Sequence, residues 1–258
     1  MRLVETTEMT IIRPEIFSRY AGISCGVSTR NGGVSPEPFT MNLSYTVGDE
    51  HSHVTTNRER FFGLLQIPLD HLAVPYQMHS DTVRLANTPG RYETCDGLIT
   101  NIPELYLAVT VADCAPIFLY DPSTQSIGAV HSGWKGSKSR IIVKAIEEME
   151  NMFGTHPNDL VAFIGPSAGV CCYEVGEEVA EEFDHQFVIR REGSKPHLDL
   201  KSHNTFLLLR AGVPKMNIEV SDYCTICTPD LFHSYRRQGK LSGRMMGVIG
   251  ISKRQSGR

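Results

Sequence analysis

Three short segments of this chain each hold a side chain that can bind a metal ion or act as a nucleophile. They contain His79, Cys114 and His131, and each follows or ends a run typical of a β-strand. The separations of 35 and 17 residues are unlike zinc-finger spacing. Two imidazoles and one thiolate are good zinc ligands, and three protein ligands leave a tetrahedral ion one open position. On spacing alone, a buried core cysteine and two locally hydrogen-bonded histidines remain the commoner explanation.

Two aspartates stand close in sequence to these side chains. Asp81 and Asp113 could each orient an imidazole through a hydrogen bond to the ring nitrogen that does not bind metal. A carboxylate at either position could equally cap a turn. The residues alone do not choose between these roles.

The segment after His131 joins a strand to a helix. Its glycines let backbone N–H groups approach a ligand, and a helix N-terminus favours an anion, so one interpretation places a phosphate beside His131. The other interpretation is a tight turn in which Ser137 is the N-cap of a helix that begins near Lys138, with no ligand.

Hydrophobic patterns predict the elements that must position these side chains. Apolar residues at helical spacing predict helices over residues 54–65 and 138–153, with two more near 177–183 and 201–209. Clustered strands with helices between them favour an α+β fold. No composition shift marks a linker, so residues 1–258 are expected to form one domain. The strand-like runs are 11–12, 23–27, 72–76, 82–85, 98–100, 105–111, 117–120, 127–130, 160–164, 217–220 and 245–251.

The composition is that of an ordinary soluble protein, with 41% apolar and 21% charged residues in 258. A formal charge of −4 argues against a nucleic-acid partner. The most apolar run, 105–120, contains Asp113 and is shorter than the roughly 20 residues of a membrane span, and no secretory signal is visible. Seven cysteines, an odd number, fit reduced thiols. A cytoplasmic protein that acts on small molecules is therefore expected.

Blocks of residues in a fixed order extend along nearly the whole chain. Four are central: Gln77-Met78-His79-Ser80, Asp96-Gly97-Leu98-Ile99-Thr100, Ala112-Asp113-Cys114-Ala115-Pro116 and His131-Ser132-Gly133-Trp134-Lys135-Gly136. Others are Met41-Asn42-Leu43-Ser44, Asn57-Arg58, Cys172-Tyr173-Glu174-Val175-Gly176, Ser234-Tyr235-Arg236-Arg237 and Ser242-Gly243-Arg244. With these blocks the chain resembles the laccase-domain family first labelled multicopper polyphenol oxidase, whose bacterial YlmD- and YfiH-type members are purine nucleoside phosphorylase-like.

This resemblance implies a fold, a cofactor and an activity. The fold is a four-layer α/β/β/α sandwich with mixed sheets, and the zinc ligands are His79, Cys114 and His131. The activity is phosphorolysis of adenosine, inosine, guanosine and 5′-methylthioadenosine, and some members also deaminate adenosine. Copper would also bind such a site in vitro, because it outcompetes zinc for most ligands.

Further residues are candidates for contacts with phosphate or nucleoside. Gly136 and Ser137 stand at the predicted anion-binding helix start. Arginine binds phosphate through paired N–H donors, although a surface role or a local ion pair explains each arginine equally well. The side chains concerned are Arg30, Asn42, Arg58, Arg236 and Arg244.

Three other functions account for parts of the sequence. A cysteine hydrolase, such as the peptidoglycan-precursor amidases within the same resemblance, would use Cys114 as nucleophile and His131 as base. It has no use for His79, which favours the metal. Copper polyphenol oxidation needs many paired histidines, whereas the single His-x-His lies at 51–53 in a polar helix. The zinc-ribbon spacing of Cys224 and Cys227, together with the adjacent cysteines 171 and 172, suggests a structural site or a redox switch.

Overall fold

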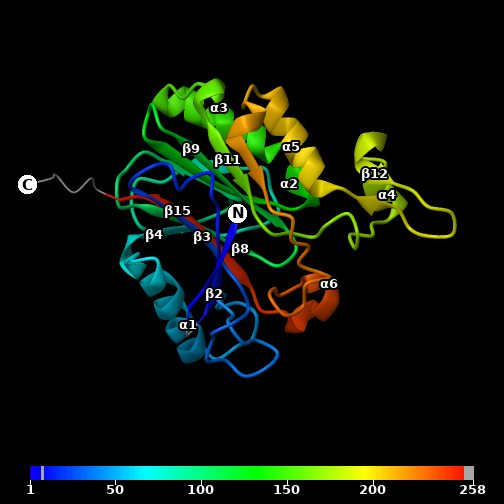
Figure 1. Ribbon diagram of the computed structural model, residues 1–258, viewed down its shortest axis with the longest axis horizontal. Coiled ribbons are helices and arrows are strands. Elements are labelled where there is room, and N and C mark those ends of the chain that lie inside the picture. Colours follow the sequence, from blue (N-terminus) through cyan, green and yellow to red (C-terminus); the bar gives the residue numbers. More distant parts are fainter. Residues whose placement is uncertain (7–8, 253–258) are drawn as a thin grey trace, which may run out of the picture.

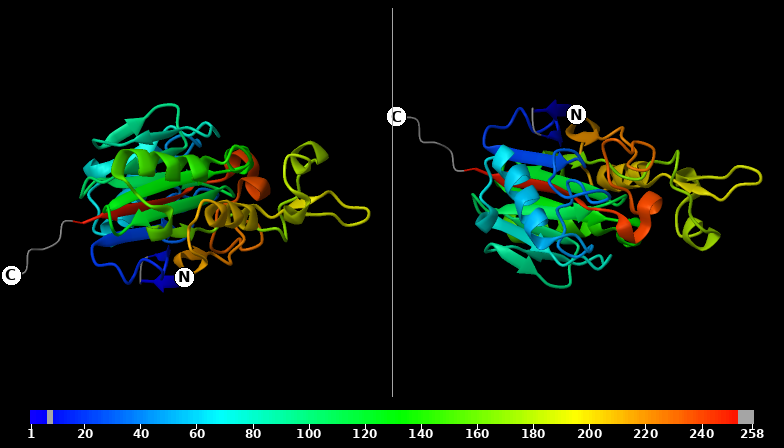
Figure 2. Two further views of the ribbon diagram at one scale, coloured as in Figure 1. Left: turned by 90° about the horizontal axis from the view of Figure 1, so that it is seen from above. Right: turned by 90° about the horizontal axis from the view of Figure 1, so that it is seen from below.

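The computed structural model describes residues 1–6 and 9–252. Two mixed β-sheets pack face to face, and helices cover the outer face of each sheet (Figures 1 and 2). The predicted α+β class and its four-layer α/β/β/α arrangement are therefore confirmed.

The first sheet has seven strands among the described residues, in the order β1-β2-β3-β15-β8-β4-β6. Strand β4 runs parallel to β8 and β6, and the other pairs are antiparallel. The strands are β1 (Arg2–Glu5), β2 (Thr10–Arg13), β3 (Ile23–Ser28), β4 (Leu72–Pro75), β6 (Gly90–Tyr92), β8 (Tyr106–Val111) and β15 (Met245–Ile251).

The second sheet has six strands in the described part of the chain, in the order β14-β11-β9-β10-β7-β5. Its outer pairs, β14 with β11 and β5 with β7, are parallel, whereas the central pairs are antiparallel. The strands are β5 (Val83–Leu85), β7 (Gly97–Thr100), β9 (Ala115–Asp121), β10 (Ser126–Ser132), β11 (Val161–Ile164) and β14 (Ile218–Val220).

Three apolar layers hold these elements together. Ile12, Val109 and Phe118 belong to the layer between the two sheets. Helix α1 (His51–Leu64) covers the first sheet through Phe61 and Phe62, and helices α3 (Ile141–Phe153) and α5 (Leu200–Arg210) cover the second. Full burial of a side chain of this size contributes roughly 1.5–3 kcal/mol, so the layers fix how the sheets lie on each other.

The predicted helix over 138–153 differs from the structure at its start. The chain forms a short helix α2 (Trp134–Lys138), and α3 begins only after Arg140, whose φ of 58° lies in the left-handed region. Ser137 is therefore inside α2 rather than at an N-cap, and its buried hydroxyl contacts Ser132 and Asn204. The turn lacks apolar periodicity, so the sequence pattern gave no sign of this helix.

The remaining helices are short. Helix α4 (Glu177–Ala180), with strands β12 (Val188–Ile189) and β13 (His197–Leu198), forms a segment that projects from the sandwich in Figures 1 and 2. Helix α6 (Tyr235–Gln238) lies shortly before strand β15 in the sequence. The predicted helix over 177–183 is thus shorter than expected, and β1, β6, β12, β13 and α6 were not predicted. In the described part of the chain, no helix has the length and apolarity to cross a membrane.

Candidate functional site

The three predicted ligands meet where the chain passes between the two sheets. His79 lies in the loop from β4 of the first sheet to β5 of the second, and Cys114 lies in the link from β8 to β9. His131 belongs to β10, opposite Pro116 of β9. Ligand atoms of the three side chains all lie within 4.8 Å of one another, so the group could hold a metal ion.

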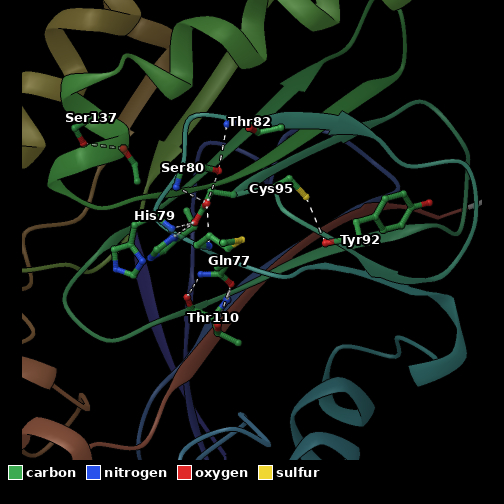
Figure 3. A network of polar contacts seen from close by, with 12 residues as sticks. Gln77, His79, Ser80, Thr82, Tyr92, Cys95, Thr110 and Ser137 are labelled. Carbon is green, nitrogen blue, oxygen red and sulfur yellow. Dashed lines mark hydrogen bonds and ion pairs between the residues drawn. The ribbon is translucent and has the colours of Figure 1, made fainter.

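The loop that carries His79 is fixed by the side chain before it. The amide group of Gln77 donates to the carbonyl oxygen of Thr110 in β8 and accepts from the backbone N–H and the hydroxyl of Thr110, each at 2.8 Å (Figure 3). His79 itself has a φ of 60°, in the left-handed region. Such a backbone persists only where its surroundings determine it, and here they do so through hydrogen bonds.

Asp96 is the carboxylate that organises the site. It is fully buried and accepts the N–H groups of Met78, His79 and Ser80 at 3.1, 3.0 and 2.6 Å. It also accepts a hydrogen bond from Nδ1 of His131 at 2.8 Å, which leaves Nε2 of that ring for the cluster. Burial alone would raise the pKa of Asp96, but the hydrogen bonds from His131 and Ser80 outweigh it and lower the pKa to about 2.

The two aspartates suggested by the sequence do not orient an imidazole. Asp81 is exposed and forms an ion pair with a lysine of α3. Asp113 accepts from the hydroxyls of Thr225 and Ser234 at 2.7 and 3.0 Å and from the N–H of Arg236 at 2.7 Å, so it helps to cap the start of helix α6. The sequence left both roles open, and the structure shows the capping role for Asp113. The missed residue, Asp96, could have been found as the polar residue directly before the buried strand β7.

Cys114 and His131 shift each other's protonation. Burial alone would raise the pKa of Cys114, but the charge and hydrogen bond of His131 and the hydrogen bond of His79 lower it to about 6. Burial alone would lower the pKa of His131, but the Cys114 charge and the Asp96 hydrogen bond raise it to about 9. Without a metal, a thiolate therefore faces an imidazolium. A metal ion binds the same thiolate in place of that proton.

Gly133 leaves the space that the cluster needs. A Cβ atom at this position would lie 2.9 Å from Sγ of Cys114 and 3.6 Å from Cδ2 of His79. The first distance is shorter than real Cβ contacts, so only glycine lets the turn into α2 pass this close to the sulfur. Two imidazoles and one thiolate, with backbone shaped around them, fit a zinc ion with one open position.

Gly133→Ala is therefore expected to weaken zinc binding by about 10- to 100-fold, since displaced ligands cost at least as much as altered supporting contacts. Backbone strain plays no part, because Gly133 has a φ of −80°. The measurement is a zinc titration against a competing chelator. Gly63→Ala in α1, where an added Cβ meets nothing within 4 Å, is the matched control with unchanged affinity. Equal affinity in both variants would mean that the ion does not bind beside Gly133.

The cluster lies in a cavity of about 490 Å³, a volume usual for a small-molecule site. Aromatic and basic side chains form much of its wall: Trp134, Tyr173, Tyr235, Arg236 and Arg244. A second cavity of about 360 Å³ shares Ser44, Thr46, Gln77 and Thr110 with the first. The two cavities therefore adjoin.

The residues predicted to contact phosphate or nucleoside fall into two groups. Arg236 and Arg244 line the cavity with the cluster, and Arg58 lines the adjoining one. The others line neither cavity. Arg30 pairs with Glu37 at 2.8 Å. The side-chain amide of the buried Asn42 donates hydrogen bonds to the carbonyl oxygen of Ser44 and to the carboxylate of Asp49. Gly136 and Ser137 are packed inside α2.

The sandwich and the cluster define a mixed α/β protein whose His–Cys–His group could hold a metal ion. The family model for the multi-copper polyphenol oxidoreductase laccase family matches residues 24–252, and the chain belongs to this family. The resemblance inferred from the sequence blocks is thereby confirmed.

Relatives and solved structures agree with this assignment. A purine nucleoside phosphorylase of Deinococcus radiodurans is 40% identical over 235 residues, which cover 88% of this chain and 89% of the relative. Another, from Bacteroides thetaiotaomicron, is 36% identical over an alignment of 267 residues, which covers 96% of this chain and 98% of the relative. The crystal structure of YlmD from Geobacillus stearothermophilus superposes with a TM-score of 0.90 at 30% identity, covering 97% of this chain and 98% of that one.

Proposed function

We propose that this chain, as one domain, catalyses phosphorolysis of purine nucleosides at a zinc ion bound by His79, Cys114 and His131. The observation that carries the proposal is the His–Cys–His cluster in the wall of a cavity that also presents arginines and aromatic rings. The names of the relatives support the reaction class. Adenosine, inosine, guanosine and 5′-methylthioadenosine are the proposed substrates, and deamination of adenosine is a proposed side activity.

His79, Cys114 and His131 would hold the zinc ion, which would supply a Lewis acid for an oxygen of phosphate or for a water molecule. Asp96 keeps a proton on Nδ1 of His131, so that Nε2 keeps its lone pair for the ion. Gln77 and Asp96 together hold the loop of His79 in place. These contacts preorganise the ligands before any substrate enters.

Phosphate binding is assigned to Arg236 and Arg244. One terminal nitrogen of Arg236 donates to the carbonyl oxygen of Glu174 at 2.8 Å, and one of Arg244 donates to that of Ser242 at 2.6 Å. These bonds fix the direction of each guanidinium and leave its other N–H groups for an anion. Arg244 also lies 5.4 Å from the ring centre of Tyr235.

The base is assigned to the aromatic wall. The rings of Trp134, Tyr173 and Tyr235 offer flat apolar surfaces on which a purine stacks. The two phenols also provide O–H donors, and a donor to the departing base stabilises the negative charge that develops on it. In this proposal, one cavity binds both reactants, the phosphate and the purine nucleoside.

The test is a product assay on purified protein with adenosine, with and without inorganic phosphate. We expect adenine and ribose 1-phosphate only when phosphate is present, with loss of both on zinc removal and recovery when zinc is restored. Equal release of adenine without phosphate would show hydrolysis. Formation of inosine alone would show a deaminase and contradict the proposed main reaction.

A cysteine hydrolase is the second candidate, and one observation favours it. Cys114, His131 and Asp96 form a chain of nucleophile, base and orienting carboxylate, with the Cys114 pKa lowered to about 6. Such an enzyme would act after zinc removal and be inactivated by thiol alkylation. We propose the cytoplasm as its location under either function, because all seven cysteines are free thiols.

A further inference from the structure

Four thiols gather in two loops outside the His–Cys–His cluster. Cys171 and Cys172 lie in the loop after β11, and Cys224 and Cys227 lie in the loop after β14, segments that run side by side in Figure 1. One sulfur from each residue lies within 4.8 Å of the other three. Sγ of Cys171 and Sγ of Cys227 are 3.7 Å apart, and all four are free thiols.

These distances fit one tetrahedral ion. Sulfurs that bind zinc at about 2.3 Å stand about 3.8 Å apart along the edges of the tetrahedron. In a disulfide bond the two sulfurs lie about 2.05 Å apart, far closer than Sγ of Cys171 and Sγ of Cys227. Iron–sulfur clusters also use four cysteines, but there the thiolates surround several iron atoms and stand farther apart than around a single ion.

The backbone around Cys224 is arranged as for a thiolate. The N–H of Gly169 donates to Sγ of Cys224 at 3.2 Å, and the N–H groups of Ile226 and Cys227 also face that sulfur. A Cβ atom at Gly169 would lie 2.9 Å from Cβ of Cys224 and 3.3 Å from Sγ of Cys171. Such N–H donors are the supporting contacts of metal-bound sulfur.

Two cations lie against the same loop. Nζ of Lys201 donates to the carbonyl oxygens of Ser221 and Tyr223, each at 2.6 Å. Arg237 donates to those of Thr225 and Ile226, each at 2.8 Å. Four thiolates around a divalent ion carry a net charge of −2, and two fixed cations nearby offset it.

We propose that Cys171, Cys172, Cys224 and Cys227 bind a single zinc ion in a structural site distinct from the His–Cys–His cluster. Binding replaces the four thiol protons, which are released to solvent. The closed set of four ligands leaves no position for a substrate, so the role of the ion is to join two loops.

The joined loops support the wall of the substrate cavity. Ser167 forms a parallel bridge with Cys224, and the N–H of Thr225 donates to the carbonyl oxygen of Ser167 at 3.0 Å. The hydroxyl of Thr225 in turn contacts Asp113, next to Cys114. Tyr173, directly after the cysteine pair, lines the cavity. The proposed ion therefore fixes one side of the cavity without touching substrate.

The test compares zinc content per chain in wild-type protein and in the Cys171→Ser/Cys227→Ser double variant, both purified with zinc and a thiol reductant. Both side chains are exposed, so the variant should fold. We expect the variant to hold about one zinc fewer than the wild type. The same difference is expected when His79→Ala is present in both proteins, which separates this site from the His–Cys–His cluster.

Cys95→Ala is the matched control, because this thiol is buried outside both clusters and its removal should leave zinc content unchanged. A chelator should lower the thermal unfolding midpoint of His79→Ala protein only while the four cysteines are intact. Equal zinc content in the wild type and the double variant would overturn the proposal. So would a zinc-free protein with a disulfide between Cys171 and Cys227, which would instead be a redox switch.

Discussion

Replacement of His79 by alanine is expected to remove zinc from the His–Cys–His cluster and to abolish phosphate-dependent release of adenine from adenosine. Two ligands remain, and since loss of a mere supporting contact costs 10- to 100-fold in metal affinity, loss of a ligand should cost more than about 100-fold. The side chain is solvent-accessible, so its removal leaves the apolar core intact. Zinc titration and the product assay measure the two effects separately.

His185→Ala is the control, because this histidine is 98% exposed and lies on the projecting segment. His185→Ala should change neither zinc affinity nor activity.

His79→Ala also separates the two proposed functions. A cysteine hydrolase that depends on Cys114, His131 and Asp96 would keep its activity in His79→Ala, whereas the zinc enzyme would lose it.

The second large effect is expected for Asp96→Asn, which keeps the shape of the side chain but replaces one acceptor oxygen by an NH₂ donor. Wherever that NH₂ group points, it meets N–H groups that now donate to Asp96: those of Met78 and Ser80 on one side, that of His79 on the other. We expect zinc affinity to fall by about 10- to 100-fold. The free energy of unfolding should fall by about 1–3 kcal/mol, because a buried donor loses its partner.

Asp81→Asn makes the same chemical change at the exposed carboxylate that pairs with α3. Surface ion pairs contribute little to stability, so zinc affinity and the unfolding midpoint should stay near those of the wild type. Chemical denaturation with parallel zinc titration distinguishes the two variants. If Asp96→Asn bound zinc as tightly as Asp81→Asn, the orientation of His131 by Asp96 would have no bearing on the metal.

Much of the fold was readable from the sequence, because most elements carry continuous apolar runs or a clear helical stripe. Strands β8, β9 and β10 and helix α3 lie close to their predicted ranges. Elements without such a signal were missed. The turn containing α2 has no apolar period, and the short β6 is largely exposed. The order of strands in the two sheets depends on contacts between distant residues, which local patterns do not contain.

The sequence pointed to the three side chains that form the His–Cys–His cluster, but not to the residues that hold them in place. His79, Cys114 and His131 stood out as residue types, and only the crossing of the chain between sheets shows how they meet. The position of Asp96 directly before β7 is visible in the sequence, but its partners, the backbone N–H groups of a distant loop, are visible only in the structure. Residue type suggests Arg30 and Asn42 as contacts for phosphate or nucleoside, whereas in the structure their side chains pair with Glu37 and Asp49.

The side chains of the His–Cys–His cluster come from two connections between the sheets and from β10 of the second sheet. Their spacing therefore depends on how one sheet lies on the other. A shift of one sheet against the other would pull on the loop of His79, because Gln77 ties this loop to β8 of the first sheet and Asp96 ties it to the start of β7 in the second. An ion bound by all three side chains would join the two connections to β10 and so resist such a shift. Loosening of the apolar layer between the sheets would then be expected to weaken metal binding while the secondary structure stayed complete.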